Sequence, residues 1–110
     1  MNVGQGHASV GHYDGSLTLW NINMRQCLSH QKLHQGEIRG VSYSADGRYV
    51  ASAGFDKAIN LTDTLNFENM SVVKTLEHDD KVVSVKWHPY LPLLISTSAD
   101  KTARIWSPNQ

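Results

Sequence analysis

The sequence predicts an all-β protein made of repeated, antiparallel four-stranded units, with about ten strands in total. Three observations predict this class: a repeat with a period of 44 residues, short apolar stretches with strand periodicity, and tight-turn signals between them. The repeat is clearest where His34 matches His78 and Asp56 matches Asp100 in one ungapped register. A looser copy comes first, in which Asp14 precedes Asp56 by 42 residues.

The strands of each copy follow from local patterns. Residues 82–87 (VVSVKW) alternate apolar and polar side chains, as a half-buried strand does, whereas residues 49–54 (YVASAG) are continuously small or apolar, as in a strand buried on both faces. The Asp46-Gly47 pair predicts a hairpin turn just before the strand at residues 49–54. The other strands with clear patterns are residues 17–20, 26–33, 41–43, 59–62, 71–76, 93–98 and 103–106.

Four short antiparallel strands in a unit of about 44 residues are typical of a propeller blade. Residues 1–33 are then a partial blade with the second to fourth strands, and residues 34–77 are a complete blade. Residues 78–110 form a last blade that lacks its outermost strand.

The repeats resemble the WD40 repeat family, which places a His before the first strand, a Ser or Thr on the second, an Asp in the second turn and a Trp at the end of the third. The last copy carries all four residues, and the middle copy has Thr62 where the Trp belongs. The first copy keeps an Asp and a Trp, with Ser9 only approximately placed. The resemblance implies a structural hydrogen-bond brace built from these residues: Asp14, Trp20, His34, Ser52, Asp56, His78, Ser96, Asp100 and Trp106.

Ten strands make about two and a half blades, whereas propellers close with at least four. We therefore expect a WD40-type β-propeller fragment, the C-terminal part of a larger propeller. Incomplete repeat arrays leave blade faces and edge strands uncovered. The isolated chain is predicted to self-associate, or to need the remaining blades of a larger propeller.

Two kinds of chemical site are weighed against this structural interpretation. Ser96, His78 and Asp100 are the ingredients of a hydrolase triad, but a catalytic set is needed once, and this set recurs in the middle repeat as Ser52, His34 and Asp56. Cys27, His30 and His34 have the spacing of half a zinc site, but Cys27 and His30 point to opposite sides of the expected strand, and no second ligand cluster follows. We expect no catalytic residue, no metal and no cofactor.

The resemblance implies that partners bind on the loop face, which is built from the loop before each first strand and from the second turn. The aromatic residues Tyr13 and Phe55 are the most indicative members, because exposed aromatic side chains are enriched at binding hot spots. The alternative for both is that they pack on a neighbouring blade edge or are simply solvated. The full candidate set is Tyr13, Glu37, Arg39, Phe55, Lys81, Val83 and Ala99.

Composition limits the class of partner. Ten basic residues balance ten acidic ones, which argues against binding to nucleic acid or to an anionic membrane. One cysteine and a start without a signal-peptide pattern favour an intracellular location, cytoplasmic or nuclear. The expected function is a non-enzymatic protein–protein interaction scaffold that binds proteins or peptides. The alternatives are a substrate-recruiting subunit of a ubiquitin ligase and a Ser-His-Asp hydrolase.

Overall fold

The computed structural model describes residues 2–4, 7–64 and 72–107, and these residues form three antiparallel sheets. The first sheet contains β1 (Asn2–Gly4), β2 (His7–Gly11), β3 (Ser16–Asn21) and β4 (Gln26–Lys32). The second contains β5 (Ile38–Tyr43), β6 (Tyr49–Gly54), β7 (Ala58–Asp63) and β8 (Val72–Glu77). The third contains β9 (Val82–Trp87), β10 (Leu94–Ser98) and β11 (Ala103–Trp106).

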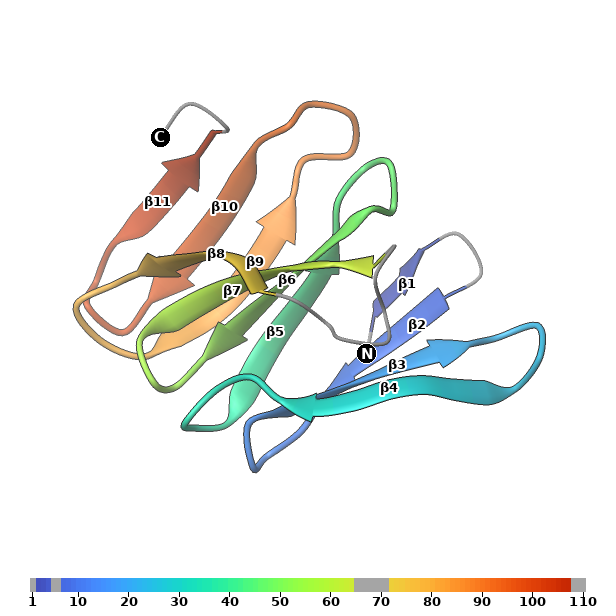
Figure 1. Cartoon of the computed structure of the whole chain (residues 1–110). Helices are drawn as coiled ribbons and strands as arrows, with labels where there is room; N and C mark the ends of the chain where they lie inside the picture. The colour runs from blue at the N-terminus through green and yellow to red at the C-terminus, as the bar shows by residue number, and fades with distance from the viewer. Residues whose placement is uncertain (1, 5–6, 65–71, 108–110) are drawn as a thin grey trace.

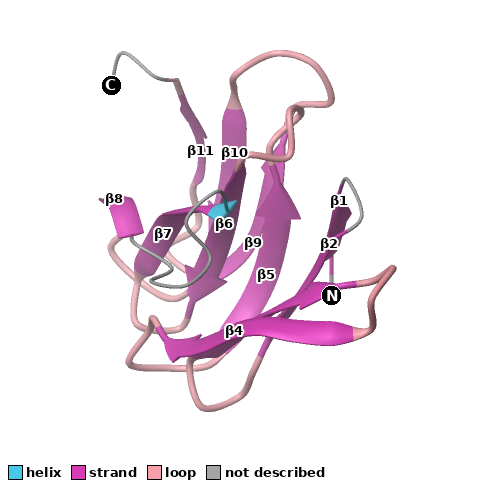
Figure 2. Cartoon of the chain, turned by 45° about the vertical axis from the view of Figure 1, so that its right-hand side comes forward, coloured by secondary structure: helices cyan, strands magenta, loops and turns pink. Residues whose placement is uncertain are grey.

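Each sheet is a simple meander in which every strand pairs with the next one in sequence. Figures 1 and 2 show the three sheets side by side, with β5 of the second sheet next to β9 of the third. This is the arrangement of successive propeller blades, and we call the sheets the first, second and third blade. No helix in the described part of the chain is long and apolar enough to cross a membrane.

The strand prediction is corrected at the N-terminus. Residues 1–33 were expected to hold only the second to fourth strands of a blade, but β1 pairs with β2 and adds a first strand. The described chain therefore has eleven strands, in agreement with the expected number of about ten. β1 is three residues long, and a segment of that length with glycine at its end carries too little pattern to predict from sequence.

Two apolar clusters join the blades. Leu17, Leu19 and Val50 belong to the cluster between the first and second blades. Ile59 and Leu94 belong to the cluster between the second and third, which Ala51 and Ala53 complete on the second blade. The small alanines let the third blade approach the sheet closely, because a flat surface of small residues leaves room for the facing side chains.

The outer face of the third blade differs from the matching face of the second. Ile95 and Ile105 are 42% and 62% exposed. Their counterparts 44 residues earlier are Ala51, which is fully buried, and Leu61, which packs against the cluster that the third blade completes. Within the described residues, the same face is thus covered in one blade and open in the next.

Candidate functional site

The four motif residues of the third blade form one continuous hydrogen-bonded chain. Trp106 Nε1 donates to Ser96 Oγ over 2.9 Å, and this hydroxyl lies 2.7 Å from Nε2 of His78. Nδ1 of His78 lies 2.9 Å from Oδ2 of Asp100. Because a carboxylate only accepts, Nδ1 donates to Asp100, which leaves Nε2 to accept from the Ser96 hydroxyl. The chain ties the loop before β9 to β10, to β11 and to the turn between them.

The Asp100 carboxylate is held by its own turn as well as by His78. Its Oδ1 accepts from the hydroxyl of Thr102 and, over 2.9 Å, from the Thr102 backbone N–H, and its Oδ2 accepts from the N–H of Asp79 over 3.1 Å. The Thr102 hydroxyl contributes most, and with the other donors it holds the pKa of Asp100 well below the ordinary value of 3.8. Asp100 is therefore an ionised, multiply bonded corner of the blade.

The second blade repeats the core of this arrangement. His34 Nδ1 lies 2.9 Å from Asp56 Oδ1, and His34 Nε2 lies 2.8 Å from Ser52 Oγ. Partial burial alone would raise the pKa of Asp56, but hydrogen bonds from His34 and from the Gln35 N–H outweigh it and keep that pKa below 3.8. Gly54 makes room for the His34 ring, because a Cβ at position 54 would lie 2.3 Å from His34 Nδ1.

The second blade differs where Thr62 replaces the tryptophan. The Thr62 hydroxyl is buried and has no hydrogen-bond partner among the described residues. Asn60 takes part instead, because its Nδ2 donates to the backbone oxygen of Leu33 over 2.7 Å and lies 3.4 Å from His34 Nε2. This role of Asn60 was not predicted from the sequence.

The first blade does not form the predicted brace. Asp14 accepts from the Ser16 hydroxyl and backbone N–H of its own turn, at 2.6 and 3.0 Å, and those bonds lower its pKa. The indole of Trp20 has no hydrogen bond within the described chain, and 40% of that residue is exposed. The register gives the reason, since Val10 pairs with Thr18 as Ser52 pairs with Asn60, so an apolar residue holds the serine position.

The backbone of each brace histidine also joins neighbouring blades. The His34 N–H donates to the Gly15 carbonyl, and the His78 N–H donates to the Lys57 carbonyl, both over 3.0 Å. Gly15, Lys57 and Lys101 occupy the same turn position, and all three have positive φ, from 71° to 91°. Lysine seldom adopts this conformation, so the repeated turn is enforced by its hydrogen bonds rather than by local preference.

Comparisons with known proteins agree with this geometry. The family described as "WD domain, G-beta repeat" matches residues 25–63 and 70–107, which together are well over half of the chain. The chain belongs to the WD40 repeat family. Actin-interacting protein 1 of Drosophila melanogaster is 35% identical over 74 residues, which are 67% of this chain and 12% of the fly protein.

Solved structures show the same WD40 fold. The β-propeller domain of Myceliophteria thermophila Cps50 (Swd1) superimposes with a TM-score of 0.84 and 17% identity, over 96% of this chain and 33% of that one. The chain thus spans 12% of the fly protein and a third of the propeller domain. The predicted recognition as a WD40-repeat β-propeller and the predicted all-β class are confirmed.

The geometry of the WD40 motif bears on the catalytic alternative. Ser96 and Ser52 are fully buried, and His34 and His78 are at most 4% exposed. The Ser96 hydroxyl is occupied by two partners, so a substrate carbonyl could not approach it without opening the blade. These residues act as structural hydrogen-bond partners in this arrangement.

The residues considered for zinc are not assembled into one site. Both ring nitrogens of His34 are engaged inside the second blade, whereas Cys27 is exposed on β4. His30 instead shares the Thr18 hydroxyl with His12, each ring nitrogen lying 2.6 Å from it. Within the described ranges, no group of three or more His, Cys, Asp or Glu side chains has a metal-binding arrangement.

Part of the predicted loop face comes together between the second and third blades. The half-buried ring of Phe55 lies below two cations, with Lys81 Nζ at 5.2 Å and Arg39 Cζ at 5.7 Å from its centre. Arg39 also approaches Glu37 at 3.4 Å. Backbone bonds of 2.8 Å, from Phe55 N–H to the Glu37 carbonyl and from Ala99 N–H to the Lys81 carbonyl, fix the cluster.

Tyr13 and Val83 do not join this cluster. Both are exposed, and neither has a hydrogen bond, ion pair or ring contact with it in the described part of the chain. Tyr13 belongs to the turn of the first blade, whose His12 carbonyl accepts from the Ile38 N–H. The cation pair above Phe55 was not predicted, because Arg39 and Lys81 lie 42 residues apart in the sequence.

Proposed function

We propose that this chain is a non-enzymatic interaction module that binds a partner protein or peptide through its loop face. WD40 propellers generally serve as protein-interaction scaffolds, so the class of function follows from the family. The observation that supports the loop face is the cluster of Arg39, Phe55 and Lys81, which presents an aromatic ring and two cations from two blades.

This cluster has the composition of an interface centre. Aromatic residues and arginine supply a large share of binding energy in protein complexes, because they combine apolar area with directional hydrogen bonding. The Phe55 backbone is anchored to the Glu37 carbonyl, so the main chain that carries the ring is ordered before a partner arrives. Such preorganisation lowers the entropic cost of binding.

Actin is the first partner to test, because the fly relative is named for its interaction with actin. The experiment compares the chain with an Arg39→Ser/Phe55→Ser/Lys81→Ser variant in filament co-sedimentation and in quantitative capture of proteins from cells. Met24→Ser is the control, since Met24 is 70% exposed on the turn between β3 and β4, away from the loop face.

We expect the triple variant to lose its captured partners at least tenfold while its melting temperature stays within a few degrees of the parent. The control should keep them. If the triple variant captured the same proteins in the same amounts as the parent, the loop face would not be the binding surface.

A further inference from the structure

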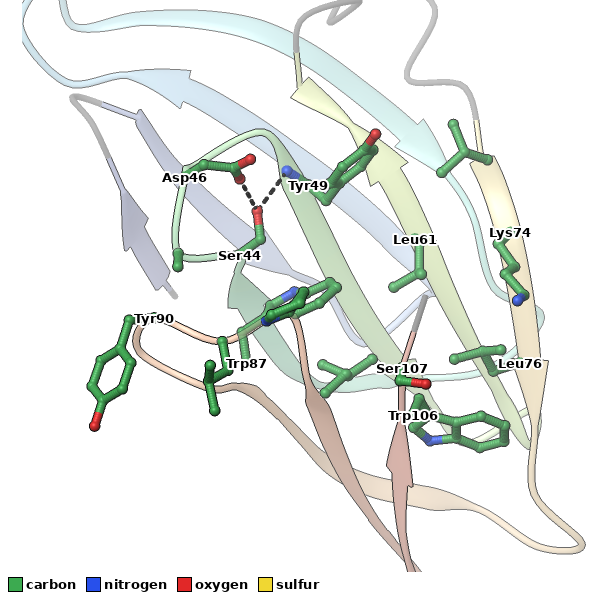
Figure 3. Close-up of a pocket in the computed structure, with 15 residues that line it drawn as sticks. Ser44, Asp46, Tyr49, Leu61, Lys74, Leu76, Trp87, Tyr90, Trp106 and Ser107 are labelled. Carbon is green, nitrogen blue, oxygen red and sulfur yellow. Dashed lines mark hydrogen bonds between the residues drawn. The ribbon is translucent and has the colours of Figure 1, made fainter. Parts of the chain in front are cut away.

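A second candidate surface lies between the second and third blades, at the end of the strands away from the loop face. It is a groove of about 530 Å³, floored by apolar side chains of both blades and open to solvent on one side. The turns that join β5 to β6 and β9 to β10 form its rim. Figure 3 shows Trp87 and Trp106 from the third blade facing Leu61 and Leu76 from the second across this space.

The junction between the first and second blades shows that the groove is not a general property of the fold. Tyr43 and Thr62 occupy the repeat positions of Trp87 and Trp106 there, and they are only 8% and 1% exposed. At the second junction both tryptophans are partly exposed along the groove. The side chains at these two positions are thus buried at the first junction, whereas at the second junction they line an opening with aromatic rings.

The rim extends the apolar surface outward. Tyr90 is 79% exposed, Val73 is 53% exposed and Leu91 is 46% exposed, and all three line the groove. Large apolar side chains that gather at the mouth of a concave site mark an interaction surface more strongly than scattered ones do. The volume lies within the range of sites that enclose several side chains or a drug-sized molecule.

The charged side chains that line the groove indicate which charges an occupant must carry. Asp46 and Lys74 lie at opposite sides of the groove in Figure 3. The Ser44 hydroxyl and the Arg48 N–H lower the pKa of Asp46, which therefore remains a carboxylate at neutral pH.

We propose that this groove binds a short peptide segment of a partner protein, with bulky apolar side chains between a basic and an acidic residue. The apolar side chains pack between Trp87, Trp106 and Leu76. The basic residue lies toward Asp46 and the acidic residue toward Lys74. This surface is independent of the loop face, because no loop-face residue lines it.

The probe is the synthetic peptide acetyl-Lys-Ser-Leu-Phe-Ser-Glu-amide, titrated against the full chain while tryptophan fluorescence is followed. Trp87 and Trp106 line the groove, so its occupation should change their emission. Three comparison peptides carry two lysines, two glutamates, or serines in place of Leu and Phe. We expect the mixed-charge peptide to bind at least fivefold tighter than either like-charged peptide, and the serine peptide not to bind.

Two pairs of variants locate the site. Val73→Asp and Tyr90→Ser change the rim, while Val83→Asp and Tyr13→Ser make the same changes at exposed positions away from the groove. The rim variants should weaken peptide binding at least tenfold, and the matched variants should leave it unchanged. The proposal is overturned if the mixed-charge peptide does not bind, if it binds both rim variants like the parent, or if like-charged peptides bind equally well. The loop-face triple variant should bind this peptide normally, so the two surfaces are tested separately.

Discussion

The braces of the second and third blades differ in one way that predicts a measurable difference in stability. Ser96 Oγ bonds both His78 and Trp106, whereas Ser52 Oγ bonds His34 at 2.8 Å and approaches the Asn60 carbonyl only at 3.4 Å. Truncation to alanine therefore removes two side-chain partners in the third blade and one in the second.

The magnitudes follow from the partners left behind. In Ser96→Ala the nearly buried His78 Nε2 loses its donor and Trp106 Nε1 loses its acceptor, so the free energy of unfolding should fall by about 2 to 4 kcal/mol. In Ser52→Ala the Asn60 amide, 3.4 Å from His34 Nε2, can close in and donate to it. The second change should therefore cost only about 1 to 2 kcal/mol.

Equilibrium urea unfolding gives both values as shifts of the midpoint at constant slope. Lys86→Ala, at an exposed position of the third blade, should change the free energy of unfolding by no more than about 0.5 kcal/mol. A double-mutant cycle of Ser96→Ala with Trp106→Phe should show a coupling energy of about 1 kcal/mol. If Ser52→Ala cost as much as Ser96→Ala, the tryptophan bond would add nothing and this account of the brace would be wrong.

Two further predictions concern charge and a buried hydroxyl. The pKa values of Asp56 and Asp100 are lower in the fold than the ordinary 3.8, so the stability they add is present above about pH 4 and is lost as pH falls through the folded pKa values. Urea midpoints should drop below pH 4, with a shallower drop in Asp100→Asn, and an unchanged slope in that variant would contradict the assignment. Thr62→Val removes a buried hydroxyl without a partner in the described chain and should raise the free energy of unfolding by about 1 kcal/mol. The matched Thr64→Val loses bonds to the Gly47 and Arg48 carbonyls and should lower it, and calorimetry that ranked the two in the opposite order would refute the argument.

The repeat made the second and third blades predictable. His34 and His78 could be assigned to braces because each has an Asp 22 residues later and a Ser 18 residues later in the same register. The first blade failed because its spacing from Ser9 to Asp14 is one residue longer than from Ser52 to Asp56. One residue changes the face of a strand, and Ser9 accordingly pairs with Leu19, as Ala51 pairs with Leu61, instead of occupying the brace position.

The two proposed binding surfaces were less accessible to sequence reasoning. Members of the loop face could be named because a repeat fixes which residues flank each turn, but the convergence of Arg39 and Lys81 on Phe55 depends on how two blades sit together. The groove has residues from five separate segments, and no local pattern marks Val73 and Tyr90 as neighbours of one opening. Contacts between repeats, unlike contacts within one, leave no fixed spacing in the chain.

Ile95 and Ile105 carry a consequence for how the chain behaves at high concentration. A sheet face that is buried in one blade and exposed in the next favours association. Covering its apolar side chains with another apolar surface removes them from water, which is favourable. Whether this face is buried or exposed therefore depends on whether a neighbouring sheet packs against it. The solubility of the chain should therefore depend on this outer face of the third blade, and a sheet that packs on the face should raise the solubility.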